Sequence, residues 1–478
     1  MNEQVLKSQE LFQNKSVWKA VFSLAVPSCI TILIMVFYNM ADMFFIGQLE
    51  DAAQVAAVSV VGPVFSLVMA VATMIGVGGC SVIAGASGEG DIEKAKICSS
   101  VCCLATLIFG IICLAGIAAG AKPLLHFLGA GEEIIPYAET YMKTLTFGVP
   151  FMLFSTAMAC ILRADGAIKE GLLGNMAGTV LNIILDPILI LGFHMGVSGA
   201  AAATVTGNLV SSIFYIYYII KKADVLTISP IYARKNPKVI FHIMAVGLPN
   251  GISGLLSGFA STFANQLLAG YGTNAIAAMA AAGKATMIIG MIQMGICMGV
   301  QPLMAYNYGS NNLARLKEIL QKVGLLTFLL GLFAAAASFL ARHELIGLFL
   351  KNTDAIAMGE SMLLFLVIAS PVVGFYYLST SFLQAAGNAM AATGVSLLRQ
   401  GVLLIPSLYF MNRILGFTGI AAAHTVADGV SAGIAFGICL WRYHMLMKKQ
   451  VKKDDIPVTP LIIEHNPEKN NTEKHALL

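Results

Sequence analysis

The sequence is poor in charged residues, and this shortage excludes most soluble proteins. Charged side chains make up 11% of the 478 residues, whereas 58% of the residues are hydrophobic. In soluble domains roughly a quarter of all residues are charged. A secreted, nuclear or cytosolic protein is therefore excluded, and we expect the lipid bilayer to be the chain's surroundings. In a membrane protein the basic residues behind a net charge of +4 indicate which loops face the cytoplasm. Nothing in the sequence indicates a nucleic-acid partner.

The sequence also lacks the signatures of an enzyme. It has no phosphate-cradling Gly-Lys-Ser/Thr loop and no zinc-binding pair of histidines. The 9 cysteines lie in or beside apolar stretches without a metal-ligand spacing, so small core residues are their expected role. We predict a protein that is not an enzyme and has no cofactor. An integral-membrane transferase acting on lipids is an alternative, but the scattered histidines form no cluster for it.

What the sequence does contain is a series of long apolar runs. Each run has about twenty residues, whereas a membrane β-strand shows about ten residues of alternating pattern. The runs predict an all-α integral membrane protein with twelve transmembrane helices. They lie near residues 18–45, 54–84, 97–121, 137–162, 170–193, 197–220, 239–268, 275–306, 318–341, 356–386, 392–412 and 417–441.

The second half of the chain repeats the first. When the chain is shifted against itself by just under half its length, prolines, glycines and loop positions coincide at one offset or its neighbours. The matched pairs are Pro150 with Pro371, Leu162 with Leu383, Gly166 with Gly387, Pro27 with Pro249, Gly88 with Gly309, Lys96 with Lys317 and 199–203 with 419–423. Six helices are an even number, so both halves enter the membrane from the same side. We expect two six-helix lobes related by a parallel internal repeat, with a central site between them.

The charges outside the runs predict the domain boundaries and the topology. The expected segments are an interfacial lead-in 1–17, an N lobe 18–220, a cytoplasmic linker 221–238, a C lobe 239–441 and a disordered tail 442–478. One face of the membrane receives few basic residues, which are Lys122, Lys143, Arg342, Lys351 and Arg413. By the positive-inside rule, both termini and the linker are expected in the cytoplasm.

Polar residues inside the apolar runs of the first half follow helical stripes. The stripes are Thr31, Met35, Tyr38 and Asp42; Asn175, Thr179, Asn182 and Asp186; and Thr204, Asn208 and Ser211. Three helices could thus converge on one oxygen-lined site. Carboxylate and amide oxygens suit a small hard cation, and an isolated buried carboxylate can carry a proton instead. A structural role for Asp42 near the headgroups, or for Asp186 in helix packing, is the alternative.

The second half carries a different set of candidates. Met287, Met291, Met294 and Met298 form a stripe of flexible thioethers that suits varied apolar ligands, although such stripes also pack helices or face lipid. Tyr376 and Tyr377 could contact a lipophilic cation. Asp428 lies within the last run, either as a second acidic site or as the partner of Arg399 or Lys284.

Taken together, the two halves and two motifs resemble the multidrug and toxic compound extrusion (MATE) family, in its MepA-like bacterial branch. The motifs are Tyr38-Asn39-Met40-Ala41-Asp42 and Gln301-Pro302-Leu303-Met304-Ala305-Tyr306-Asn307-Tyr308-Gly309. The resemblance covers about residues 10–445. It implies a secondary active transporter that exports amphipathic, often cationic organic compounds in exchange for Na⁺ or H⁺ by alternating access. It also implies a bacterial inner membrane, a role in antibiotic resistance, and a chain expected to act as a monomer.

The resemblance assigns roles to individual residues. Asp42, Asn182, Asp186 and Thr204 fall at the family's N-lobe cation site, where Na⁺ is the one metal ion expected. Asp428 matches an acidic position of the last span. The expected substrate cavity comprises Tyr38, Asn175, Lys284, Met287, Met291, Gln293 and Tyr376. A seventh-span carboxylate of other branches is absent, and the chain offers Asn265 and Gln266 there, which favours coupling through the N lobe.

Within transport, the alternative is a lipid or lipid-linked oligosaccharide flippase of the same superfamily. Such a protein usually carries additional cationic residues in its cavity. Only Lys284 and Arg399 are left for that role once the other basic residues are assigned to the two faces of the membrane.

Overall fold

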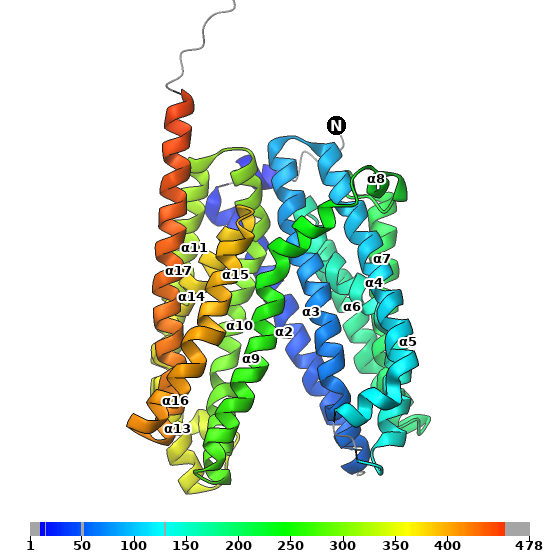
Figure 1. Cartoon of the computed structure of the whole chain (residues 1–478), viewed down its shortest axis with the longest axis vertical. Coiled ribbons are helices and arrows are strands. Elements are labelled where there is room, and N and C mark those ends of the chain that lie inside the picture. Colours follow the sequence, from blue (N-terminus) through cyan, green and yellow to red (C-terminus); the bar gives the residue numbers. More distant parts are fainter. Residues whose placement is uncertain (1–9, 15, 49–51, 129–130, 455–478) are drawn as a thin grey trace, which may run out of the picture. The chain divides into compact units, whose positions relative to one another are not determined.

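The computed structural model describes residues 10–14, 16–48, 52–128 and 131–454, and every regular element in them is a helix (Figure 1). This confirms the predicted all-α class. By their internal contacts the residues form two units, one up to Cys439 and one from Leu440 onwards. The packing described below belongs to the first unit.

The helices of the first half follow one another with short connections. They are η1 (Glu10–Asn14), α2 (Val17–Gly47), α3 (Ala52–Glu89), α4 (Ile92–Phe127), α5 (Ile135–Ile161), η2 (Leu162–Asp165), α6 (Ile168–Pro187), η3 (Ile188–Gly192) and α7 (Val197–Lys221). The predicted linker contains the short helix α8 (Pro230–Lys235).

The helices of the second half repeat this order with two breaks. They are α9 (Val239–Ala269), α10 (Thr273–Gly309), α11 (Leu313–Leu340), α12 (Arg342–Gly347), α13 (Thr353–Ile368), α14 (Ser370–Ala385), α15 (Ala389–Leu397), η4 (Leu398–Leu403), α16 (Leu404–Leu415) and α17 (Phe417–Asp454). The π-helical turn η4 joins α15 to α16 within one membrane-length segment, Ala389–Leu415.

Eleven of the described helical segments are long and apolar enough to span a membrane. Taken together, α13 and α14 are also long and apolar enough for one span, which would be the twelfth, but they are bent by 46° where 356–386 was predicted as one run. The break lies at Ala369, just before Pro371 in the first turn of α14, because proline has no N–H to continue the helical hydrogen bonds.

The last helix is longer than its predicted span. Residues 442–454 belong to α17, where the sequence predicted the beginning of a disordered tail. Six of the 13 residues in this stretch are Met or Lys, which are good helix formers. The predicted tail from 455 to 478 lies outside the described residues.

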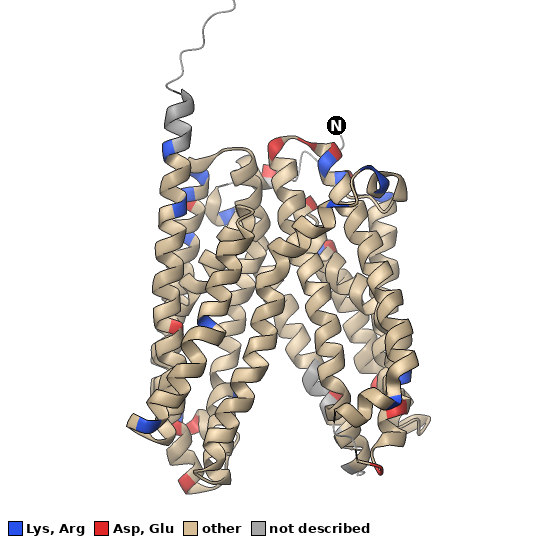
Figure 2. Ribbon diagram, in the orientation of Figure 1, with Lys and Arg blue, Asp and Glu red and all other residues tan. Residues whose placement is uncertain are grey.

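Each half has an apolar core of its own. One cluster of buried side chains runs from Ile46 to Ala201, and another runs from Ala260 to Ala427. Large apolar side chains also remain exposed, including Phe241 and Phe333, both 73% exposed. Charged residues gather toward the two ends of the helices, and few lie between them (Figure 2). Exposed apolar residues between charged ends are what a bilayer requires.

The two halves meet through α2, α3, α9 and α10. Glycines bring α3 and α10 into backbone contact, since a Cβ on Gly88 would lie 2.1 Å from the Tyr306 carbonyl oxygen. A Cβ on Gly309 would lie 2.2 Å from the carbonyl oxygen of Gly85. We call this α3–α10 contact the seam. Gln301 strengthens it by donating a buried hydrogen bond of 2.8 Å to the Ser81 hydroxyl.

The segment preceding α2 also reaches the second half. The Phe12 side chain is 1% exposed and packs against the Tyr306 ring, with 5.1 Å between ring centroids. The Phe12 carbonyl accepts hydrogen bonds from Arg315 Nε at 2.9 Å and Asn307 Nδ2 at 3.3 Å. Gln13 donates to the Tyr306 hydroxyl at 2.7 Å. Residues that lead into the first half are thereby bound to α10 and α11 of the second.

Candidate functional site

The polar stripes of α6 and α7 face each other because glycines let the two helices approach. A Cβ on Gly178 would lie 2.4 Å from the Gly207 carbonyl oxygen, and a Cβ on Gly207 would lie 2.6 Å from that of Gly178. Larger residues at these positions would force the helices apart. The close approach allows short polar side chains of the two stripes to reach one another.

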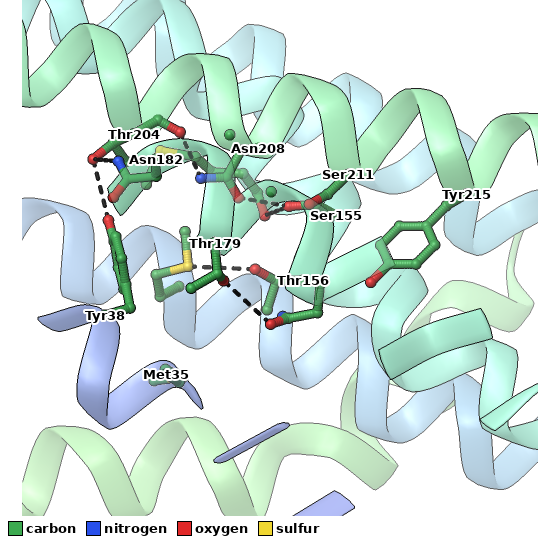
Figure 3. A pocket seen from close by; sticks show the side chains of 15 residues that line it. Met35, Tyr38, Ser155, Thr156, Thr179, Asn182, Thr204, Asn208, Ser211 and Tyr215 are labelled. Atoms are coloured by element: carbon green, nitrogen blue, oxygen red, sulfur yellow. Dashed lines mark hydrogen bonds between the residues drawn. The ribbon is translucent and has the colours of Figure 1, made fainter. Parts of the chain in front are cut away.

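Thr204 is the centre of a hydrogen-bonded group formed by three helices. Its hydroxyl lies 3.1 Å from the Tyr38 hydroxyl of α2 and accepts from Asn182 Nδ2 of α6 at 3.4 Å (Figure 3). Asn182 is 2% exposed and Thr204 is 8% exposed. The predicted convergence of the three helices is therefore present in the structure.

A second polar group extends this arrangement along α7. Asn208 accepts a hydrogen bond of 2.8 Å from the Ser155 hydroxyl of α5 and donates to the Thr204 carbonyl at 2.9 Å. Ser211 donates to the carbonyl of Gly174 at 2.8 Å. Together these bonds hold α5, α6 and α7 in fixed register around the Thr204 group.

These side chains enclose a cavity of about 270 Å³ within the first half. Its lining combines hydroxyls, amides, aromatic rings and thioethers. The lining residues are Met35, Tyr38, Met69, Met152, Ser155, Thr156, Asn175, Gly178, Thr179, Asn182, Thr204, Gly207, Asn208, Ser211 and Tyr215. Among the described residues, no charged side chain lines it. We call it the N-lobe cavity.

The two candidate carboxylates lie beside this cavity and do not line it. Asp186 follows Asn182 by one helical turn and is fully buried, and neither of its carboxylate oxygens has a hydrogen-bond partner among the described residues. Asp42 follows Tyr38 by one turn, and its Oδ1 is likewise unpartnered. A buried charge without a partner costs roughly several kcal/mol, so each carboxylate is stabilised when a cation or a proton neutralises it.

The neighbouring oxygens suit a small cation better than a transition metal. The described residues contain no cluster of three His, Cys, Asp or Glu side chains that could hold a metal ion. The Asn182 Oδ1 atom, by contrast, is buried and without a hydrogen-bond partner among the described residues. Like the carboxylates of Asp42 and Asp186 and the Thr204 hydroxyl, it offers an oxygen of the kind that hard cations prefer.

The candidates of the second half do not join the N-lobe cavity. Met287 is 42% exposed, and Lys284 is exposed with its ammonium 5.8 Å from the centre of the Phe349 ring. Gln293 is buried and donates to the carbonyls of Thr327 and Ser370 at 3.0 and 2.9 Å. Met291, half-buried on the same helix, is also absent from that lining. Their part in a substrate cavity stays a prediction.

Asp428 and Tyr376 belong to a separate cluster. Asp428 Oδ1 lies 2.7 Å from Arg399 Nε, which is the pairing that the sequence left open as an alternative to a second acidic site. The Arg399 guanidinium lies 4.4 Å from the ring centre of Tyr376 and 5.4 Å from that of Tyr377. Asp428 therefore has a cationic partner that Asp42 and Asp186 lack among the described residues.

The sequence analysis missed the contribution of α5. Ser155 and Thr156 line the cavity, and Met152 precedes them on the same helix. Two adjacent hydroxyl residues in the middle of an apolar run were the available signal. They are adjacent and do not continue at spacings of three or four residues, so they form no helical stripe that would have indicated a site.

Comparison with known proteins finds one family twice along the chain. The model of the MatE family matches residues 27–188 and matches again over residues 249–410. The first match begins at Pro27 and the second at Pro249, a pair that the sequence analysis had already superimposed. The two matches confirm the predicted internal repeat.

Relatives of known role are similar over nearly the whole length. The multidrug export protein MepA of Staphylococcus saprophyticus is 34% identical over 429 residues, covering 89% of this chain and 95% of that protein. MepA of Staphylococcus aureus is 32% identical with the same coverage. Among solved structures, the outward-facing conformation of a multidrug resistance MATE family transporter is 25% identical with a TM-score of 0.87, covering 94% of this chain and 99% of that one.

Proposed function

Because the chain belongs to the MatE family, we propose that it is a multidrug exporter, a secondary active transporter of small organic compounds by alternating access. The observation that carries this proposal is the N-lobe cavity, whose hydroxyl, amide, aromatic and thioether lining suits varied amphipathic molecules. A lipid-linked oligosaccharide flippase is not favoured, because no cationic side chain is among the residues that line the cavity.

The proposed substrates are amphipathic, often cationic drugs. Asp42 and Asp186 stand beside the cavity without a basic partner among the described residues, so they offer negative charge near it. A cavity of about 270 Å³ is close to the lower end of the range for drug-sized ligands. We therefore expect the cavity to hold the charged or aromatic part of a substrate, with the rest of the molecule extending beyond it.

The proposed coupling ion is Na⁺ or H⁺, bound at Asp42 and Asp186. Na⁺ would use the carboxylates with Asn182 Oδ1 and the Thr204 hydroxyl, whereas H⁺ would neutralise a carboxylate directly. In either case the ion removes the negative charge that attracts a cationic drug. Entry of the ion from outside would thereby favour release of the drug.

The energetics of exchange depend on stoichiometry. One charge moving through about 100 mV yields roughly 2.3 kcal/mol, which supports a concentration ratio of about fifty. A one-for-one exchange of H⁺ for a monovalent drug cation moves no net charge. That exchange would use the chemical gradient of the ion alone.

The proposed setting is a bacterial inner membrane with both termini in the cytoplasm and the protein as a monomer. The basic residues of the predicted linker, such as Lys221, Lys222 and Lys238, support this orientation through the positive-inside rule. The proposed moving bodies are the lobes 18–220 and 239–441, each with its own apolar core.

Reconstituted vesicles test the proposal. Efflux of a fluorescent lipophilic cation is measured under an imposed Na⁺ gradient and, separately, under a pH gradient, for the wild type and for Asp186→Asn. We expect one gradient to drive transport in the wild type and neither to do so in Asp186→Asn. The matched control is Asp354→Asn, a carboxylate on an exposed helix start, which should transport normally. Absence of wild-type transport under both gradients would contradict the proposed export, and wild-type rates in Asp186→Asn would contradict the coupling site.

A further inference from the structure

The Arg399 cluster of the second half holds a cation within a carboxylate and two aromatic rings. Arg399 Nε lies 2.7 Å from Asp428 Oδ1, and the guanidinium carbon lies 4.4 and 5.4 Å from the ring centres of Tyr376 and Tyr377. The Arg399 side chain is 13% exposed and the Asp428 side chain is 22% exposed. A carboxylate with aromatic faces is the arrangement that binds organic cations. Here the bound cation is a side chain of the protein itself.

The internal repeat places this cluster where the first half has its cavity. Pairs at the offset that joins Pro150 to Pro371, or at the neighbouring offset that joins Gly199 to Gly419, relate the two regions. At these offsets five of the side chains and glycines that line the N-lobe cavity have counterparts in or beside the cluster. The pairs are Ser155 with Tyr376, Thr156 with Tyr377, Asn175 with Ser396, Gly178 with Arg399, and Asn208 with Asp428.

The contacts correspond as well as the positions. In the first half the α5 residue Ser155 bonds to Asn208 of α7. In the second half the counterpart of Ser155 is Tyr376. The Tyr376 ring contacts Arg399, which is the partner of Asp428. The Tyr376 hydroxyl forms a hydrogen bond of 3.5 Å with Ser396. The principal difference is Arg399, a long cationic side chain at the position where α6 has Gly178, the glycine that lets α6 approach α7.

We propose that Asp428, Tyr376 and Tyr377 form a second organic-cation site, in the C lobe, and that Arg399 is its tethered occupant. The ligand class is a planar monovalent cation with delocalised charge, such as a guanidinium or amidinium compound. A tethered group competes at an effective concentration in about the millimolar range or above, so free cations at lower concentration do not displace it. Arg399 thereby limits cation binding to the first half.

Removing the guanidinium tests this site. Purified Arg399→Ala in detergent is titrated with ethylguanidinium, and its thermal unfolding midpoint is recorded. The titration extends to about 10 mM, which is of the order of the effective concentration of a tethered group. We expect a rise of about 2 °C or more, because a ligand that binds the folded state stabilises it. Wild type, with the site already filled, should show no rise, and neither should Arg399→Ala/Asp428→Asn, which lacks the carboxylate.

The controls separate specific binding from general effects of salt and of arginine loss. NaCl at the same ionic strength replaces ethylguanidinium in a parallel titration. Arg413→Ala is the matched variant, because Arg413 also lies over a ring, 4.6 Å from Tyr409, yet is exposed and forms no ion pair among the described residues. It should not respond. An unchanged midpoint in Arg399→Ala, or an equal rise in the double variant, would overturn the proposal.

A variant that fails to fold still gives an answer. Arg399→Gln, which keeps much of the side chain's length, is then prepared in its place. If both variants are lost, they are expressed and purified with ethylguanidinium present throughout. Recovery of folded protein that needs Asp428 would support the site, and no recovery would contradict it. Drug export by the wild type is measured separately in vesicles, so the failure of either proposal is recognised independently.

Discussion

The two halves share one backbone plan but treat their buried carboxylates in opposite ways. In the first half Asp42 and Asp186 have no basic partner among the described residues and border a cavity. In the second half Asp428 is paired with Arg399, and that pair and two tyrosines occupy positions equivalent to residues that line the first-half cavity. The duplication preserved helix order and glycine turns. It did not preserve the charge of the interior.

Cation binding inside a lobe depends on both a cavity and a negative charge that no basic side chain already balances. Gly178 and Gly207 let α6 and α7 approach closely enough for their polar side chains to line the cavity. Asp42 and Asp186, without a basic partner among the described residues, place negative charge beside it. The second half has Arg399 at the position of Gly178, and its guanidinium is paired with Asp428. On our proposal, this one residue makes the two related lobes unequal in cation binding.

The largest expected effect comes from removing the negative charge of the first half. Asp186→Asn should abolish ion-driven efflux while the protein remains folded, because the amide has nearly the same shape and no charge to bind Na⁺ or H⁺. Efflux in vesicles gives the rate, and size-exclusion chromatography monitors the fold. Retention of half or more of the wild-type rate would break the comparison between the lobes.

The next effect concerns the neutralised pair. Asp428→Asn leaves the Arg399 charge largely buried without its partner, which costs about 3 to 5 kcal/mol by analogy with other buried pairs. We expect a marked fall in thermal stability but, in the surviving folded protein, coupled efflux by the same ion. Arg399→Gln/Asp428→Asn should recover part of the stability. If Asp428→Asn abolished coupling in a stable protein, the second half would share the ion site.

Closing the space of the first half should have an intermediate effect. In Gly178→Ala the added methyl group would meet the Gly207 carbonyl, forcing α6 from α7 at a cost of about 1 to 3 kcal/mol. We expect a lower unfolding midpoint and weaker binding of a fluorescent cation, measured by anisotropy. The matched control is Gly254→Ala, because a Cβ at Gly254 meets nothing within 4 Å. Equal behaviour of the two variants would count against the cavity.

A smaller effect is expected at the shared hydroxyl. Thr204→Val removes the group that Tyr38 and Asn182 both contact, and a hydrogen bond is worth about 1 kcal/mol net. The apparent affinity for the coupling ion should fall about fivefold, read from the ion dependence of efflux. Thr204→Ser keeps the hydroxyl and should stay near the wild type. No difference between valine and serine would place the ion elsewhere.

The smallest effect is expected from the exposed residues of α10. Met287 and Lys284 lie on the surface of the second half, and substitutions at such positions usually change stability by less than about 0.5 kcal/mol. Met287→Ala and Lys284→Ala should therefore leave the unfolding midpoint nearly unchanged. If both residues line a substrate cavity, as the sequence predicts, the variants should export a changed range of drugs in the vesicle assay. An unchanged drug profile in both variants would remove them from the predicted cavity.

The sequence predicted the helices and the first-half stripes because both depend on local pattern. Apolar length located the spans, and spacings of three and four placed Asn182 and Asp186 on one face of α6. It could not show that α13 and α14 bend by 46°, because the angle depends on how helices pack around Pro371. It also left open which cation pairs with Asp428, because that choice depends on the three-dimensional position of Arg399 in η4.

The contacts of the seam are related by the internal repeat. At the offset that joins Pro150 to Pro371, Gly85 corresponds to Tyr306 and Gly88 to Gly309. Gly88 contacts Tyr306, which is the equivalent of Gly85. Gly309, which is the equivalent of Gly88, contacts Gly85, so the same contact is made twice with the halves exchanged. Reciprocal contact of this kind is the rule for a twofold homodimer. The seam thus has the symmetry of a homodimer interface, formed here between the two halves of one chain.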